Sequence, residues 1–286
     1  MGVESTPPPS PKPASDPGRA GRNLPAAIGV GVGLGIVIIG SLFWYKFLFI
    51  FVVLAAVLLA VDEMIKSLRT GGAVIPRVPV IAGTVAMMVA AYFGGPMALL
   101  TAMAGTVLAT IFWRMPGGSV GFVRDTSAGV FLIGYVPLLA GFAILLVQPD
   151  EDGALRVLTF FLVVVASDVG GYVAGVLFGK HPMAPTISPK KSWEGFAGST
   201  LACIGAGVAS VVFLLDGHWW VGAIVGVVAV VTATVGDLGE SMIKRDLGIK
   251  DMSNLLPGHG GVMDRLDSLL ATAPAVWLLL HLLVKG

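Results

Sequence analysis

Apolar residues run along this chain in long stretches that short polar segments separate. Nine of these stretches approach the roughly 20 residues that an α-helix needs to cross a bilayer. They cover residues 26–43, 46–61, 78–93, 96–113, 126–147, 155–178, 196–215, 219–235 and 268–284. The pattern predicts an all-α, polytopic membrane protein with about nine transmembrane helices. The first two stretches are nearly continuous around Tyr45, so one long kinked helix is the alternative there.

The first 24 residues differ from the rest of the chain. They are rich in Pro, Ser and Gly and contain almost no large apolar side chain. Such a segment cannot bury enough apolar surface to offset its conformational entropy, so residues 1–24 are expected to form a disordered cytoplasmic tail. The segment lacks the basic start and cleavage site of a signal peptide. Residues 25–286 are then one transmembrane domain.

The basic residues indicate which helix ends face the cytoplasm, because Lys and Arg in short loops are retained on that side. With nine spans and a cytoplasmic N-terminus, only Lys46, Arg156 and Lys285 lie on the opposite side. The cytoplasmic set is Lys12, Arg19, Arg22, Lys66, Arg69, Arg77, Arg114, Arg124, Lys180, Lys190, Lys191, Lys244, Arg245, Lys250 and Arg265. We therefore expect a multi-pass protein of the bacterial inner (cell) membrane, with any active site facing the cytoplasm.

Composition excludes several other classes of protein. Only 12% of the residues are charged, well below the usual share in soluble domains. A net charge of +1 argues against a protein that binds nucleic acid electrostatically. Cys203 is the single cysteine, so the chain can form neither an internal disulfide nor a multi-cysteine zinc site.

Glycines recur in the first apolar stretch at Gly29, Gly31, Gly33 and Gly35, which form two overlapping G-x-x-x-G patterns. Small residues at this spacing let helices approach closely in lipid. Packing within the protein is the favoured interpretation. A homodimer interface is the alternative.

Two features of the sixth stretch and the segment after it could carry chemistry. Asp168 stands in apolar surroundings and would cost at least about 2.5 kcal/mol if it faced lipid, so it must face protein or a water-filled cavity. A purely structural aspartate is the alternative. Lys190 and Lys191 precede the seventh stretch and could bind an anion, or could simply be solvated residues of a cytoplasmic loop.

A stronger signal begins at the end of the eighth stretch. Asp237, Glu240, Ser241 and Lys244 are spaced i, i+3, i+4 and i+7, which places them on one face of a helix. The apolar helix is therefore expected to continue as an amphipathic helix with one polar stripe.

The segment that follows combines carboxylates, cations and glycines. Its polar residues are Lys250, Asp251, His259, Asp264, Arg265 and Asp267. Gly260 and Gly261 would expose backbone N–H groups, as phosphate-binding loops do. Carboxylate oxygens suit Mg²⁺ that is shared with substrate phosphates. Together with the stripe, this segment indicates metal-assisted phosphoryl or nucleotidyl transfer at the membrane surface.

The run SMIKRDLGIKDMSNLLPGHGGVMDRLD, residues 241–267, resembles the motif of the phosphatidate cytidylyltransferase (CDP-diacylglycerol synthase) family. The matching positions are Ser241, Lys244, Arg245, Lys250, Asp251, Pro257, His259, Gly260, Gly261, Asp264, Arg265 and Asp267. Residues 167–195 are similar to a second block of that family. The resemblance covers about residues 157–284, the half expected to carry the active site.

The resemblance implies a reaction in which CTP and phosphatidic acid give CDP-diacylglycerol and pyrophosphate, with Mg²⁺ as cofactor and a second cation as an alternative. It implies that Asp237, Asp264 and Asp168 hold metal. Catalytic roles fall to Lys244, Arg245, Lys250, Asp251, His259, Arg265 and Asp267. Substrate binding falls to Lys190, Lys191, Ser241, Gly260 and Gly261.

Two other functions compete with this one. A CTP-dependent polyprenol or phytol kinase would place similar charges at the same interface. A transporter could use Asp168 to couple protons or cations, although the long charged segment 236–267 disfavours it.

Overall fold

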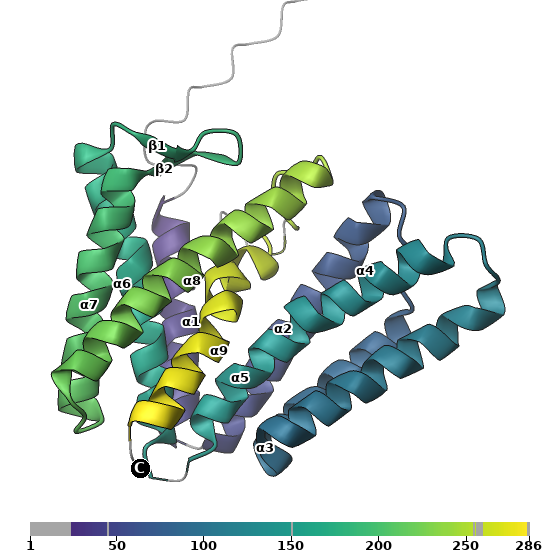
Figure 1. Ribbon diagram of the computed structural model, residues 1–286, viewed down its shortest axis with the longest axis horizontal. Coiled ribbons are helices and arrows are strands. Elements are labelled where there is room, and N and C mark those ends of the chain that lie inside the picture. Colours follow the sequence, from purple (N-terminus) through teal and green to yellow (C-terminus); the bar gives the residue numbers. More distant parts are fainter. Residues whose placement is uncertain (1–23, 45, 150, 254, 256–259, 285–286) are drawn as a thin grey trace, which may run out of the picture.

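The computed structural model describes residues 24–44, 46–149, 151–253, 255 and 260–284. The chain in these ranges is almost entirely helical, which confirms the predicted all-α membrane class (Figure 1). Residues 1–23 of the predicted tail lie outside the described residues, and the first helix begins at Leu24.

Nine helices and one small hairpin follow one another along the described chain. The helices are α1 (Leu24–Trp44), α2 (Lys46–Thr70), α3 (Arg77–Arg114), α4 (Phe122–Tyr135), α5 (Pro137–Val147), α6 (Gly153–Phe178), α7 (Trp193–Leu214), α8 (Trp219–Asp246) and α9 (Met263–Leu283). A single 3₁₀ turn, η1 (Met115–Gly117), follows α3. Strands β1 (Pro182–Ala184) and β2 (Ser188–Ser192) pair antiparallel between α6 and α7.

Seven helices of the described residues are long and apolar enough to cross a membrane, so the predicted count of nine is not confirmed. The difference arises at α1 and α3. In α1 the apolar stretch described with its side chains is Gly35–Trp44, which is too short to cross a membrane by itself. The segments α4 and α5 together make one candidate span, Phe122–Val147, as the apolar pattern predicts. The number of crossings and the side of the N-terminus stay predictions.

Helix α3 includes two of the predicted apolar stretches in one candidate span, and it is bent sharply in the middle. Gly95 has a φ of 69°, which is not helical, and Pro96 follows it. A Cβ added at Gly83 in the first half would touch Thr106 in the second half. The two halves of α3 therefore lie side by side, with the turn at the place where the apolar pattern predicts a break.

Helix α9 is the central element of the bundle. It contacts α8 and α6 on one side and α5 and α2 on the other. In Figure 1 it lies between the group formed by α6, α7 and α8 and the fan formed by α2 to α5. Both hydrophobic clusters of the core include α9 residues, such as Leu270 in one and Val276 in the other. Residues at the beginning of α9 are therefore held by contacts from both halves of the protein.

Glycines allow the backbones of the C-terminal helices to approach closely. A Cβ added at Gly207 on α7 would collide with the carbonyl oxygen of Gly222 on α8, and the reverse is also true. On the other side of α8, a Cβ at Gly236 would lie 2.5 Å from the carbonyl oxygen of Asp267 on α9. Small residues favour this kind of packing in lipid, where van der Waals contact drives association. The contact at Gly236 brings α8 and α9 together beside Asp237.

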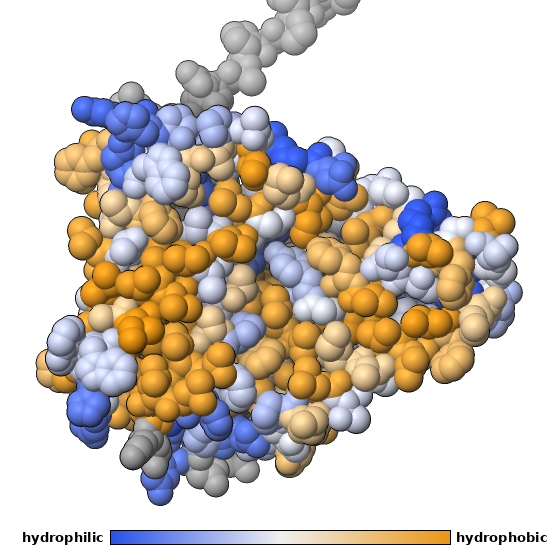
Figure 2. Space-filling model, viewed as in Figure 1, coloured by the Kyte–Doolittle hydropathy of each residue, from blue (hydrophilic) through white to orange (hydrophobic). Residues whose placement is uncertain are grey.

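The surface of the protein matches a membrane environment. Figure 2 shows a broad hydrophobic middle with hydrophilic residues at the two ends of the bundle. Trp113 and Trp193 are 58% and 56% exposed near one end, and Trp219 is 66% exposed at the other. Tryptophan is enriched at both interfaces between membrane and water. These residues are consistent with a multi-pass protein whose two ends lie at the headgroup layers.

The glycine stripe of the first apolar stretch does not pack as the sequence suggests at its two described positions. A Cβ added at Gly33 or Gly35 would meet no atom within 4 Å. These two glycines of α1 thus face open space. Whether a second copy of the chain covers them stays a prediction.

The contact between α7 and α8 predicts a specific sensitivity to side-chain size. Gly207→Val should lower the thermal midpoint of the detergent-purified protein, because overpacking of this kind costs about 1–3 kcal/mol. Gly205→Val is the matched control on the same helix, since a Cβ there meets nothing within 4 Å. Equal midpoints for the two variants would show that the close approach does not stabilise the fold.

Candidate functional site

The predicted polar stripe is confirmed as one face of α8. Asp237, Glu240, Ser241 and Lys244 all line the same cavity of about 480 Å³. The apolar helix continues without interruption to Asp246, so the stripe stands at the end of a membrane-spanning helix. Helical spacing alone explains why four residues in eight positions share this surface.

Other elements complete the cavity around this stripe. Asp168 comes from α6 and Lys191 from β2, while the segment after α8 supplies Asp251. The first turns of α9 contribute Asp264, Arg265, Asp267 and Ser268. The structure therefore brings together carboxylates that lie up to about a hundred residues apart in the sequence.

Lys244 lies between two carboxylates of the cavity wall. Its Nζ is 2.7 Å from Oδ1 of Asp264 and also donates to Glu240. Glu240 is only 1% exposed, and its second oxygen, Oε1, has no hydrogen-bond partner among the described residues. A buried carboxylate oxygen without a donor is costly, so this atom is a natural acceptor for a bound cation or donor.

Asp264 has an additional role in shaping the segment before α9. Its Oδ2 accepts hydrogen bonds from the backbone N–H of Met252 at 3.0 Å and of Gly261 at 2.7 Å. The bond from Gly261, three residues earlier, resembles the acidic half of a capping box. Gly260, at a φ of 81°, packs against the same carboxylate. Both oxygens of Asp264 are therefore already hydrogen-bonded.

The cavity carries an excess of negative charge. Six carboxylates line it, against three basic side chains, which leaves three formal negative charges uncompensated if all are ionised. Among the described residues, no group of three or more His, Cys, Asp or Glu side chains is already arranged to hold a metal ion. Instead, the lysines at 191 and 244 lie against the acids at 237, 240 and 264. Anionic ligands would need additional cations to bind here.

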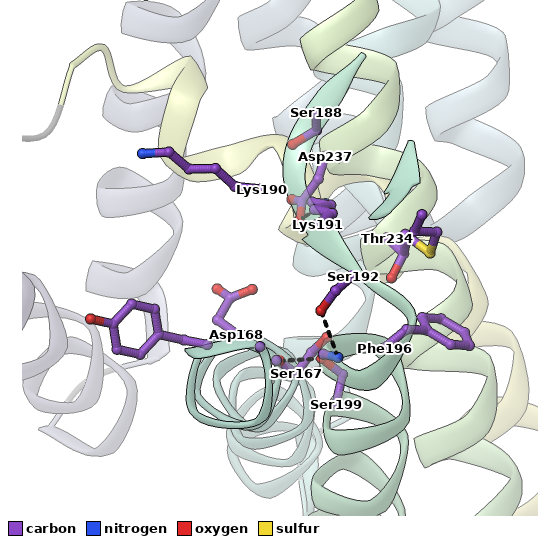
Figure 3. Close-up of a pocket in the computed structure, with 15 residues that line it drawn as sticks. Ser167, Asp168, Ser188, Lys190, Lys191, Ser192, Phe196, Ser199, Thr234 and Asp237 are labelled. Carbon is purple, nitrogen blue, oxygen red and sulfur yellow. Dashed lines mark hydrogen bonds and ion pairs between the residues drawn. The ribbon is translucent and has the colours of Figure 1, made fainter. Parts of the chain in front are cut away.

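A second cavity of about 340 Å³ adjoins the first. Asp168, Lys191 and Asp237 line both, so they form a shared wall. Figure 3 shows the Asp168 carboxylate pointing toward the strand that carries Lys190 and Lys191. The Nζ of Lys191 is 2.5 Å from Oδ2 of Asp237, which fixes one cation at the junction of the two cavities.

The wall of the second cavity is built where α6 and α7 pack closely. The hydroxyl of Ser199 donates to the carbonyl of Ser167 at 2.7 Å, and Ser192 caps α7 by accepting from the N–H of Gly195 at 3.1 Å (Figure 3). Gly171 lines the cavity between them. The short side chains where α6 meets α7 leave room for a ligand beside the lysines of β2.

The β1–β2 hairpin that carries these lysines is held at two points besides Lys191. Glu194 accepts hydrogen bonds from the backbone N–H groups of Lys180 and His181 at 3.1 and 3.2 Å, and contacts the His181 ring at 2.5 Å. Arg245 donates from Nε to the carbonyl of Ile187 at 3.4 Å. The hairpin is thus attached to both α7 and the end of α8.

Some predicted site residues are not brought into either cavity. Arg245 and Lys250 are exposed and are not among the described residues that line them. Arg245 contacts the hairpin instead. Gly260 and Gly261 lie behind Asp264, in the segment that leads to α9. His259 lies outside the described residues.

Two carboxylates near the site received no role from the sequence. Glu240 was visible as part of the stripe, but its complete burial was not. Glu63 on α2 is 4% exposed and contacts the segment before α9. The signal that could have found Glu63 is the one that identified Asp168, since a carboxylate in an apolar helix must face protein or a cavity.

Known proteins resemble this chain over nearly all of its length. The sequence profile of the cytidylyltransferase family matches residues 25–283. A phosphatidate cytidylyltransferase of Mycobacterium tuberculosis is 45% identical over 285 residues, which cover 95% of this chain and 87% of that protein. One from Mycobacterium leprae is 46% identical over 284 residues, covering 93% and 90%. One from Pseudomonas aeruginosa is 39% identical over 201 residues, covering 68% and 73%. The similarity thus extends well beyond residues 157–284.

The position of Lys244 predicts a large effect on stability. Lys244→Met should destabilise the fold by about 3 kcal/mol, because it leaves Glu240 and Asp264 as buried charges without their cation. Thermal unfolding in detergent measures the change. Lys250→Met is the control, since Lys250 is exposed. A variant at 244 as stable as the control would mean that the three groups do not act as a compensated cluster.

Proposed function

Because the chain belongs to the cytidylyltransferase family, we propose that it transfers cytidylate from CTP to phosphatidic acid, giving CDP-diacylglycerol and pyrophosphate for phospholipid synthesis. The observation that carries the proposal is the polar cavity between α6, α8 and α9, which contains Asp237, Lys244 and Asp264 at the end of a membrane-spanning helix. A reaction between a water-soluble nucleotide and a lipid headgroup requires a site at the membrane surface, where such a helix ends.

Two adjoining cavities suit two anionic substrates. The larger one is lined by charged residues and would receive the triphosphate of CTP. The smaller one includes Lys190 and Lys191 and also the aromatic side chains of Tyr172 and Phe196. Tyr172 and Val176 are each 67% exposed on the outer face of α6. A phosphatidic acid molecule could therefore place its phosphate near the lysines while its acyl chains stay against α6.

The proposed reaction is an in-line displacement. A phosphate oxygen of phosphatidic acid attacks the α-phosphorus of CTP, and the bond from this phosphorus to the oxygen that bridges to the β-phosphate breaks, so that pyrophosphate leaves. The nucleophile is already an anion, so no strong general base is needed. Catalysis then depends on holding two anions together and on neutralising charge. Lys191, Lys244 and Arg265 are the cations of the cavity that could do so.

The chemistry of the cavity fits a divalent cation, and Mg²⁺ is part of the proposal. Its carboxylates are hard oxygen donors, they outnumber the basic side chains, and the buried Oε1 of Glu240 has no donor in the described chain. Asp168 and Asp237, which line both cavities, would hold the ion most directly, Asp237 through Oδ1 because Lys191 pairs with its Oδ2. Asp264 would do so only if Lys244 moved, since its oxygens already accept hydrogen bonds. When bound, Mg²⁺ would neutralise phosphate charge.

An orientation with the site toward the cytoplasm is also part of the proposal. Basic residues of the described chain gather at the end of the bundle that holds the site. Arg114 and Arg124 both contact Asp125 there, and Asp125 accepts from the backbone of Val74. A Cβ added at Gly71 would meet Leu247, which follows α8. The positive-inside tendency then places this end in the cytoplasm.

Isotopic labelling tests the reaction directly. Purified protein is incubated with phosphatidic acid, Mg²⁺ and CTP labelled either at the α- or at the γ-phosphate. We expect the α-label in the lipid and the γ-label in pyrophosphate. A lipid kinase would instead place the γ-label in the lipid, which would reject the proposal. Diacylglycerol in place of phosphatidic acid is the control and should give no labelled lipid.

Substitution of the carboxylates tests the metal assignment. Asp237→Asn should reduce the rate by about 100-fold or more and raise the Mg²⁺ concentration that gives half of the maximal rate, because a charged ligand is lost. Asp264→Asn should also reduce the rate. Asp216→Asn, in the turn between α7 and α8, is the control and should leave the rate unchanged. Wild-type rates in both folded site variants would contradict the assignment.

A further inference from the structure

Glu63 on α2 is a buried carboxylate. It lies far from the other residues of the site in the sequence. It is 4% exposed, and Val61 and Met64 near it on α2 belong to the hydrophobic core. Burial of a carboxylate is unfavourable unless its oxygens receive hydrogen bonds. The environment of Glu63 must therefore supply donors.

Three donors from the segment around the start of α9 satisfy Glu63. Oε1 accepts from the hydroxyl of Ser253 at 2.5 Å and from the backbone N–H of Val262 at 3.0 Å. Oε2 accepts from the backbone N–H of Met263 at 2.8 Å. In the described part of the chain, its partners are thus one hydroxyl and two backbone groups rather than a Lys or Arg.

Through these contacts Glu63, a residue of α2, caps the N-terminal end of α9. The first N–H groups of a helix have no partner within it, and the helix end carries partial positive charge. Val262, at the N-terminal boundary of α9, has an apolar side chain that cannot accept a hydrogen bond. The carboxylate from α2 accepts from the boundary residue and from the first residue of α9, one step before the N–H groups that a Ser, Thr or Asp at this position would reach.

Glu63 also constrains the segment that leads into α9. A Cβ added at Gly261 would lie 2.6 Å from Oε2 of Glu63, so the carboxylate fills the space that any larger residue at 261 would need. The hydroxyl of Ser67, one turn further along α2, donates to the carbonyl of Met252 at 3.4 Å. Met252 follows Asp251, which lines the charged cavity. Helix α2 thus contacts the segment between α8 and α9 at two places, near its middle and where it enters α9.

We propose that Glu63 is a positioning residue for the transfer reaction, one that sets the place of Asp264 and Asp267 by capping α9 from outside. Glu63 is not among the described residues that line the cavity, so its effect must pass through the first turns of α9. The inference rests on the proposed function for its kinetic consequences, but the capping contact itself is independent of any reaction.

The geometry predicts which kinetic constants depend on Glu63. Asp264 and Asp267 lie in the cavity assigned to CTP, whereas Lys190 lies only in the cavity assigned to the lipid phosphate. Displacement of the start of α9 should therefore lower kcat and raise the KM for CTP. It should leave the KM for phosphatidic acid nearly unchanged, because the contacts of the β1–β2 hairpin run to α7 and α8.

The test compares Glu63→Gln with Asp62→Asn in the full-length protein in detergent. Glutamine keeps the size of the side chain but directs an N–H₂ group at one of the backbone donors. Asp62 is the neighbouring acid, and it pairs with Lys66 and Arg77 away from the cavity. For Glu63→Gln we expect kcat to fall about 10-fold and the KM for CTP to rise about 3-fold, as misplacement of reacting groups predicts. Amide hydrogen exchange at Val262 and Met263 should accelerate about 10-fold. Asp62→Asn should change none of these.

Each outcome bears on the proposal. Unchanged amide exchange at the start of α9 in Glu63→Gln would overturn the proposal, because Glu63 would then not cap the helix. Loss of activity with accelerated exchange throughout the bundle would also overturn it, because the role of Glu63 would then be merely structural. If Glu63→Gln does not fold, Ser253→Ala removes one of the three donors and should show the same pattern at reduced size. If the wild-type protein makes no CDP-diacylglycerol, the proposed function fails, while the exchange measurement still decides whether Glu63 caps α9.

Discussion

The first turn of α9 is the point on which the site depends. Three groups on two other helices converge on the start of α9: Glu63 on α2 binds its backbone, Lys244 on α8 binds Asp264, and Gly236 on α8 lets that helix lie against Asp267. None of these contacts is made by α9 alone. The position of the carboxylates at its start is therefore a property of the whole bundle, and their distance from the α8 stripe is set by helix packing rather than by a local loop.

Much of the fold and part of the site could be predicted from the sequence, because both follow from short-range periodicity and from the cost of charge in lipid. Helical spacing placed Asp237, Glu240, Ser241 and Lys244 on one face, and the same cost argument placed Asp168 at a cavity. The break near Gly95 was also visible as an interruption in the apolar pattern, although the count of nine crossings was not confirmed.

What could not be predicted depends on contacts between distant segments. The pairing of Lys191 with Asp237 joins residues 46 positions apart, and the contact between Glu63 and Met263 joins residues 200 apart. The motif that ends in Asp267 suggested one cluster of basic residues, yet Arg245 turns to the β1–β2 hairpin. Residue type and spacing do not determine which of several lysines meets which carboxylate, since that choice is made by the tertiary packing of α6, α8 and α9.

The backbone contact at Gly236 has a further consequence for the geometry of the site. Where two helices meet through glycine, no long side chains lie between them that could slide or repack, so a small separation removes the contact altogether. The distance between α8 and α9 is then set at this point by backbone contact. Residue 236 is therefore the position at which a larger side chain would widen the spacing between Asp237 and Asp267.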